Sequence, residues 1–163
     1  MKWVLMALCL VILQLESHLQ VFNLEMEESD YHRLHDALQL AADDAVEMVT
    51  QDSVSGGQPV FDQTKADMTF RNTLANNLDL DPSTWQPKPN TLLKTAPQVL
   101  DEEFFDWSNA SFPYHYVNGT YGIDVTMNEP SIVLVVRFMM PTYAPNVKPF
   151  TMDVPVVASY HGH

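Results

Sequence analysis

No proline or glycine interrupts residues 1–50, and this stretch opens with the unbroken apolar run Trp3–Leu13. As a helix the run would be about 16 Å long at about 1.5 Å per residue, whereas the hydrocarbon core of a bilayer is about 30 Å thick. Beyond the run, apolar residues continue at the intervals of three and four that mark one helix face. This stripe comprises Val11, Leu15, Leu19, Phe22 and Met26. Residues 1–24 are therefore predicted to form a membrane anchor helix whose stripe meets other helices.

Polar residues beside the stripe leave two interpretations of the anchor open. Glu16 and His18 are either intramembrane and in contact with partner helices, or interfacial, with only Trp3–Leu13 in the hydrocarbon. The first interpretation requires partners, because a carboxylate among lipid tails costs at least about 2.5 kcal/mol on insertion scales. A cleaved signal peptide fits less well, since no small residues follow the run. Lys2 before the run and many carboxylates after it predict a single pass through the cell membrane with the C-terminal domain extracellular.

Residues 25–52 are predicted to continue the anchor as an extracellular helical stalk. Apolar and small side chains recur there at intervals of three and four, namely Tyr31, Leu34, Leu38, Ala41, Ala45 and Met48. We therefore expect one helix from about Trp3 to Thr50, stopped by the segment Ser53–Gly57. Its small residues would allow another helix or a sheet to approach closely.

The charge of the chain excludes some partners. Eight basic residues stand against 21 acidic ones, giving a net charge of −13, and nine of the carboxylates lie between Glu25 and Asp52. Nucleic acid is not expected as a partner, because phosphate binding needs clustered lysine and arginine. Cys9 is the single cysteine, so no disulfide can form within the chain and packing must hold the domain together.

Residues 53–163 are predicted to form a small α+β domain. An accessory helix is expected over Phe61–Asn77, with Asp62 as its N-cap. After a turn-rich connection the pattern becomes typical of strands, which we place at Val99–Trp107, Tyr114–Val117, Tyr121–Met127, Ser131–Met140 and Phe150–Tyr160.

Ser131–Met140 is continuous, apolar and rich in β-branched residues, which favours a central strand. We expect it to pair with Tyr121–Met127 through the turn Asn128–Pro130, and Pro155 suits an edge strand or a bulge. The predicted fold class is α+β: a long N-terminal helix packed on a small antiparallel β-sheet with one accessory helix.

Three groups of residues are candidates for chemistry, and each has a plainer interpretation that we favour. His32 and His35, beside Asp36, have a metal-binding spacing but lack an evident third ligand. Asp101, Glu102, Glu103 and Asp106 could be catalytic acids or calcium ligands, but a solvated strand edge is the preferred interpretation. Trp107, Tyr114, Tyr116 and Tyr121 form either a surface contact for carbohydrate or protein, or the core of a small sheet. With no known catalytic motif in the sequence, we expect no enzyme, no metal and no cofactor.

The Lys2 leader, the run Trp3–Leu13, the register of the segment Leu34–Ala42 and the strand-rich C-terminal part together resemble the pilin-like proteins of Tad-type (tight adherence) pilus systems. The resemblance is to the broad TadE-like group, and above all to its Gram-positive versions. It implies a subunit that associates with itself or with other pilin-like subunits through the N-terminal helix. The expected function is thus structural, in a surface filament or its assembly apparatus. The alternative is a membrane-tethered ligand-binding module of the cell envelope.

Overall fold

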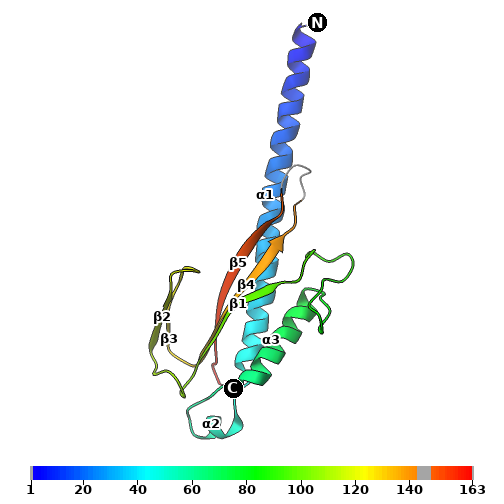
Figure 1. Cartoon of the computed structure of the whole chain (residues 1–163). Helices are drawn as coiled ribbons and strands as arrows, with labels where there is room; N and C mark the ends of the chain where they lie inside the picture. The colour runs from blue at the N-terminus through cyan, green and yellow to red at the C-terminus, as the bar shows by residue number, and fades with distance from the viewer. Residues whose placement is uncertain (1, 143–147, 163) are drawn as a thin grey trace.

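A computed structural model describes residues 2–142 and 148–162, except for the side chain of Asn23. Its dominant element is α1, a helix of 45 residues over Lys2–Val46. The N-terminal half of α1 projects beyond the rest of the molecule, while the C-terminal half lies along the domain (Figure 1). The predicted continuous N-terminal helix and the predicted α+β fold class are confirmed.

The end of α1 differs from the prediction, which extended the helix to Thr50. The helix ends at Val46, before any proline or glycine. Val49 instead forms an isolated antiparallel bridge with Phe61, and the backbone N–H of Thr50 donates to the carbonyl of Val60 at 2.9 Å. Because these pairings take the backbone out of the helical path, long-range contacts rather than a local stop signal terminate α1.

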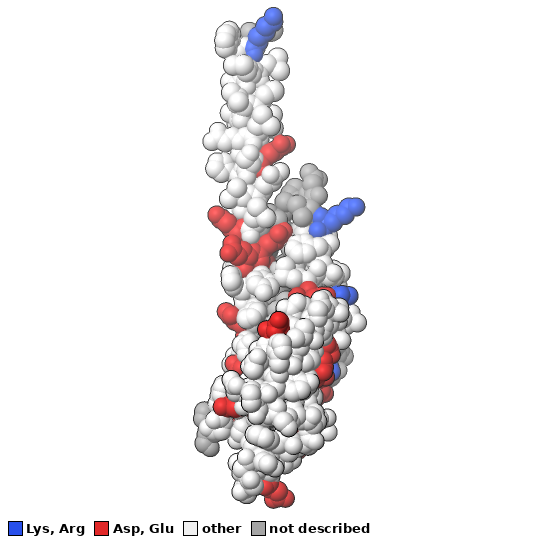
Figure 2. Space-filling view, turned by 90° about the vertical axis from the view of Figure 1, so that its left-hand side faces the viewer, with Lys and Arg blue, Asp and Glu red and all other residues white. Residues whose placement is uncertain are grey.

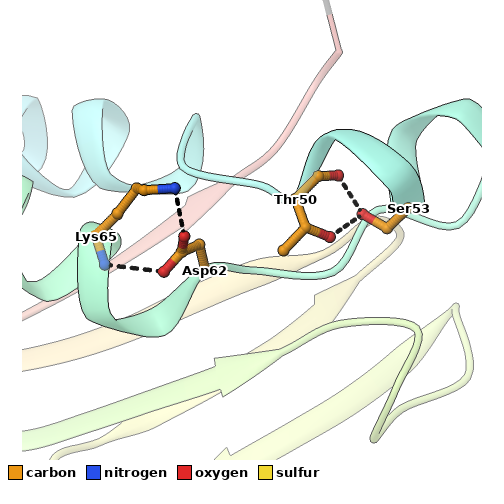
Figure 3. Close-up of polar contacts among 4 residues, drawn as sticks. All are labelled: Thr50, Ser53, Asp62 and Lys65. Atoms are coloured by element: carbon orange, nitrogen blue, oxygen red, sulfur yellow. Dashed lines mark hydrogen bonds and ion pairs between the residues drawn. The ribbon is translucent and has the colours of Figure 1, made fainter.

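The segment Ser53–Gly57, predicted as the stop, mostly belongs to the short helix α2, Gln51–Ser55. Thr50 precedes α2, and its hydroxyl donates to Ser53 Oγ at 2.8 Å (Figure 3). Ser53 Oγ in turn donates to the carbonyl of Thr50 at 2.7 Å and accepts from the N–H of Val60 at 2.9 Å. These bonds fold residues 50–60 into a compact connection.

The accessory helix α3 covers Gln63–Asn77, and the predicted N-cap Asp62 is confirmed. The carboxylate of Asp62 accepts from the N–H of Lys65 at 3.2 Å and pairs with Lys65 Nζ at 2.7 Å (Figure 3). The hydrogen bonds from Lys65 hold the pKa of Asp62 below its usual value. An ionised cap at this end also suits the helix dipole.

The main sheet is antiparallel, with three strands in the order β1-β4-β5. They span Gln98–Phe105, Ser131–Met140 and Phe150–Ser159 respectively. The prediction that Ser131–Met140 is the central strand is confirmed. Pro155 lies in β5, at an edge of the sheet, as its missing N–H requires.

The expected pairing of Tyr121–Met127 with the central strand is wrong. The strand found there, β3 (Ile123–Met127), pairs with β2 (Tyr114–Asn118) in a separate two-stranded sheet. Both edges of β4 are already occupied by β1 and β5, so no edge remains for β3. The carbonyl of Pro130 accepts from the N–H of Tyr160 at 2.8 Å, which ties the turn before β4 to the end of β5.

The two faces of β4 explain why its sequence is apolar apart from Ser131 and Arg137. Ile132, Leu134 and alternate residues after them belong to a large core shared with α1 and α3. Val133 and Val135 point to the other face, where they share a second core with residues of the β2–β3 hairpin. The molecule therefore has three layers, and the C-terminal half of α1 is part of the larger core.

Candidate functional site

The N-terminal half of α1 contacts no other described part of the chain. Every residue from Lys2 to Glu25 is exposed, leaving aside the side chain of Asn23. Leu19 is 49% exposed and Phe22 53%, as expected for side chains that touch only their own helix. This segment is about 35 Å long at about 1.5 Å per residue, comparable with the hydrocarbon core of about 30 Å. By length and composition α1 is able to cross a membrane.

The predicted stripe lies on this projecting segment. Val11, Leu15, Leu19 and Phe22 are exposed, whereas Met26 is half-buried. Because the stripe residues are three or four apart, they share one face of α1. The first four are thus free to contact lipid or another helix, and the fifth lies where the domain begins to cover α1.

The polar residues of the projecting segment are exposed on the helix surface. Ser17 satisfies its hydroxyl within the helix, because Oγ donates to the carbonyl of Leu13 at 3.0 Å. Glu16 and His18 make no polar contact with any described residue of the chain. In a membrane these two side chains would have to reach headgroups, water or another protein.

An acidic belt follows directly after the apolar segment. It consists of Glu25, Glu27, Glu28 and Asp30. Figure 2 shows a group of acidic side chains on α1 beside the upper end of the domain. Asp30 is buried against the domain and Glu27 is half-buried, while the other two are exposed. Four carboxylates over six residues set a sharp limit to the part of α1 that could lie in hydrocarbon.

The four aromatic residues singled out from the sequence do not form one surface cluster. Tyr116 is buried, and Tyr114 and Tyr121 pack around the same hairpin core. Burial and a hydrogen bond to Glu103 raise the pKa of Tyr116 to about 12. Trp107 alone is well exposed, at 39%. Three of the four thus have a packing role, and Trp107 is the one available for contact.

The prediction of a solvated strand edge holds only in part, because β1 is an edge strand with half-exposed acidic residues, but these have side-chain partners and Asp106 is buried. Asp101 accepts from Asn118 Nδ2 at 3.2 Å and Glu103 accepts from the hydroxyl of Tyr116, both on the hairpin face. Glu102 points to the opposite face, toward α3, where burial first and the carboxylate of Asp67 second raise its pKa. Alternation along the strand separates these groups, as expected for β structure.

Asp106 has a structural role that the sequence did not reveal. Its side chain is only 1% exposed, and one carboxylate oxygen accepts from the N–H of Phe61 at 3.1 Å. The other oxygen accepts from the N–H and hydroxyl of Ser108, at 2.8 and 2.5 Å. Asp106 therefore joins the end of β1 to the segment that begins α3.

No metal site is formed by the described residues, among which no group of three or more histidine, cysteine or acidic side chains lies close enough together. His32 lies 4.0 Å from Glu28, and His35 lies 3.8 Å from Asp36. Each histidine thus has a carboxylate beside it on the exposed side of α1. These contacts are of the kind found on a solvated helix surface.

A small cavity at the far end of the domain was not anticipated from the sequence. It has a volume of about 210 Å³, and its walls include Trp107, Pro130 and Tyr160. The pair His161–Glu129, with Nδ1 and Oε2 3.1 Å apart, lies at its edge. These residues come from three distant segments, so only the exposed aromatic side chain of Trp107 could have pointed to it.

A scan against family models and searches of curated proteins and of solved structures found no match.

Proposed function

We propose that this chain is a single-pass membrane-anchored surface protein that acts as a structural or assembly subunit of a pilus-like filament or surface apparatus. Its polymerising or docking element is the projecting half of α1. The observation that carries the proposal is the exposed apolar surface from Trp3 to Leu24, which no described part of the chain covers. Burying one large apolar side chain is worth about 1.5–3 kcal/mol, so this surface requires lipid or protein around it.

The polar residues of the segment favour protein over lipid as part of that surrounding. Glu16 and His18 have no polar partner among the described residues, and lipid tails offer none. Between helices in a membrane, polar side chains can bond across the interface for about 1 kcal/mol each. Copies of α1, or helices of related subunits, would supply such partners along the face of Leu15 and Leu19.

The charges around the anchor support an extracellular domain. Lys2 lies at one end of the apolar segment, and the acidic belt from Glu25 to Asp30 lies at the other. Positive charge is favoured on the cytoplasmic side of a membrane helix. The bulk of the chain, with its net charge of −13, would then lie outside.

A second candidate function is a membrane-tethered ligand-binding module. It is favoured by the cavity beside Trp107 and Tyr160, which lies at the end of the domain remote from the projecting half of α1. Apolar walls with a few polar groups at the edge are typical of small-molecule sites, although about 210 Å³ is below their usual size of about 300–1,000 Å³. In this case α1 would serve only as a tether.

Cysteine crosslinking in whole cells separates the two functions. Single cysteines are placed at Leu19 or Phe22 in a Cys9→Ser background, with Leu24→Cys as a matched control. Leu24 is also exposed, at 63%, but at about 100° per residue it lies roughly opposite Phe22 on the helix. Assembly through the stripe predicts ladders of oligomers from Leu19 and Phe22 and much weaker ladders from Leu24.

A substitution in the stripe tests the same point without crosslinking. Leu19→Glu should remove both the ladder formed through Phe22→Cys and any filament, while the domain stays folded, because Leu19 contacts no part of it. The tethered module would be favoured if crosslinking at Leu19 and Phe22 yields only monomers and the Leu19→Glu variant is displayed on the cell surface as well as the parent. Sequencing the N-terminus of the mature protein is also required, since cleavage within residues 1–24 would remove the anchor and overturn both functions.

A further inference from the structure

We propose that the end of the domain where β4 finishes and β5 begins rests on the membrane surface, with its exposed apolar side chains in the headgroup layer and its lysines on lipid phosphates. This membrane-contact end comprises Met139, Phe150, Lys94 and Lys148. The inference depends on the proposed insertion of α1 in a bilayer. It adds a second contact with the membrane, made by the domain itself.

The first argument for the contact is the position of this end along α1. β4 runs toward the N-terminal end of α1 and β5 runs back, so the last residues of β4 and the first residues of β5 form the part of the main sheet nearest the projecting segment (Figure 1). Both strands pack against α1. The domain begins to cover the helix at Met26, within about one helical turn of Leu24, the last apolar residue of the exposed segment. A bilayer spanned by that segment would therefore end where the domain begins.

The second argument is that α1 joins the projecting segment rigidly to the domain. No proline or glycine lies within α1, and its buried residues from Leu34 to Val46 are packed in the main core. The domain cannot swing away from the membrane without bending the helix or losing that packing. Its orientation relative to the bilayer is thus set by α1.

The side chains at this end suit a headgroup layer. Met139 is 37% exposed and Phe150 is 38% exposed, so both are large apolar side chains left partly in solvent at this end of the sheet. A cavity of about 170 Å³ is lined in part by Met139 and Lys94. Apolar side chains beside lysines are typical of surfaces that lie at a membrane interface, where the ammonium group reaches phosphate and the stem stays in the apolar layer.

The lysines differ from three of the four other basic residues of the domain; the fourth, Lys88, is also exposed and has no ion pair with a described residue. Lys65, Arg71 and Arg137 each pair with a carboxylate, at 2.7, 2.6 and 2.6 Å. Lys94 and Lys148 are exposed and are paired with no carboxylate of the described residues. Figure 2 shows basic side chains in blue at this end of the domain, close to the acidic belt.

The acidic belt decides which lipid chemistry is required. Glu25 and Glu28 are exposed at the same level of α1, and they oppose a strongly anionic membrane. The contact must therefore depend on the phosphate that zwitterionic lipids also carry, together with the apolar contribution of Met139 and Phe150. We expect it to form on phosphatidylcholine and to gain little from added phosphatidylglycerol.

Site-directed spin labelling of the full chain tests the contact. The Cys9→Ser protein is reconstituted in phosphatidylcholine nanodiscs and labelled at Met139→Cys or Phe150→Cys. Val117→Cys, 58% exposed on β2, is the control for a label in water, and Leu10→Cys is the control for a label in the bilayer. Collision with oxygen and with a water-soluble nickel complex reports the depth of each label.

The expected result is protection from nickel at Met139 and Phe150 that lies between the values for Leu10 and Val117. The double variant Lys94→Gln/Lys148→Gln should raise the nickel accessibility of both labels toward that of Val117. Lys65→Gln, in the first turn of α3, should leave it unchanged. If nickel reaches the labels at Met139 and Phe150 as readily as the label at Val117 while the label at Leu10 stays protected, the contact is refuted. The proposed anchor is then unaffected. Nickel access at Leu10 as well would instead refute the anchor.

Discussion

The buried carboxylate of Asp106 offers the sharpest test of how the two halves of the domain are joined. It binds the N–H of Phe61 before α3 and the N–H and hydroxyl of Ser108 after β1. The change Asp106→Ala removes both acceptor oxygens, and with them all three hydrogen bonds, while leaving the backbone free to keep its path. We expect it to destabilise the domain far more than the loss of one surface side chain.

The size of the loss in stability depends on whether each donor can find another hydrogen-bond acceptor. Phe61 is 4% exposed, so its N–H would have no partner, and a buried unmade hydrogen bond costs about 1–3 kcal/mol. Ser108 is exposed, so its groups can turn to water at a smaller cost, of about 0.5 kcal/mol each. The total is about 2–4 kcal/mol, against about 5–15 kcal/mol for the whole stability of a small domain. A fall in Tm of about 10 °C is expected.

Thermal unfolding of the full chain in detergent, followed by tryptophan emission, measures this loss. Trp85 reports on the main core, where it is buried beside Phe70. Ser108→Ala is the matched control, since it removes one surface hydroxyl and should cost less than about 1 kcal/mol. An Asp106→Ala protein that melts within a degree or two of the parent would refute the reasoning.

Three further changes probe other parts of the fold. Leu38→Pro, in the fully buried part of α1, should cost at least about 3 kcal/mol and leave the domain open to limited proteolysis; resistance equal to the parent's would contradict the continuous helix. Val135→Asp places a carboxylate between the main sheet and the hairpin and should abolish the cooperative melt, whereas Val135→Ala should only lower its midpoint by removing buried methyl groups. Hydrogen bonds from Arg137 lower the pKa of Asp153, so their contribution to stability is present above the ordinary carboxyl pKa of about 3.9 and is lost as the pH falls through the lower folded value. Arg137→Ala should therefore reduce stability slightly at pH 7 and weaken its acid dependence in urea titrations; an acid limb identical to the parent's would show that the pair contributes nothing.

Elements with a strong periodic pattern could be predicted from the sequence. The spacing of Leu34, Leu38, Ala41 and Ala45 fixes which face of α1 is buried, and all four are in the core. The nearly continuous apolar sequence of β4 predicts a central strand, which is correct. Such patterns record local periodicity and burial, which the side chains themselves determine.

Pairing between strands could not be predicted in the same way. β3 precedes β4 directly in the chain, yet β1 and β5 take both of its edges. Backbone hydrogen bonds are similar for any apolar strand, so the sequence of β4 does not specify its neighbours. The end of α1 and the role of Asp106 were missed for a related reason, since both depend on Phe61, which lies outside α1 and far from Asp106 in the sequence. The candidate contact surface on α1 was predictable, whereas the cavity beside Trp107 was not.

The bridge between Val49 and Phe61 also has a consequence for the order of folding. It closes a short connection that turns α3 back along α1, so the two helices form an antiparallel hairpin from neighbouring sequence (Figure 1). The main sheet, in contrast, must bring β1 to β4 across the whole β2–β3 hairpin. Closing a longer loop costs more entropy, and local contacts form faster. Because the N-terminal part also leaves the ribosome first, the helical hairpin is expected to gain amide protection before any strand of the main sheet does.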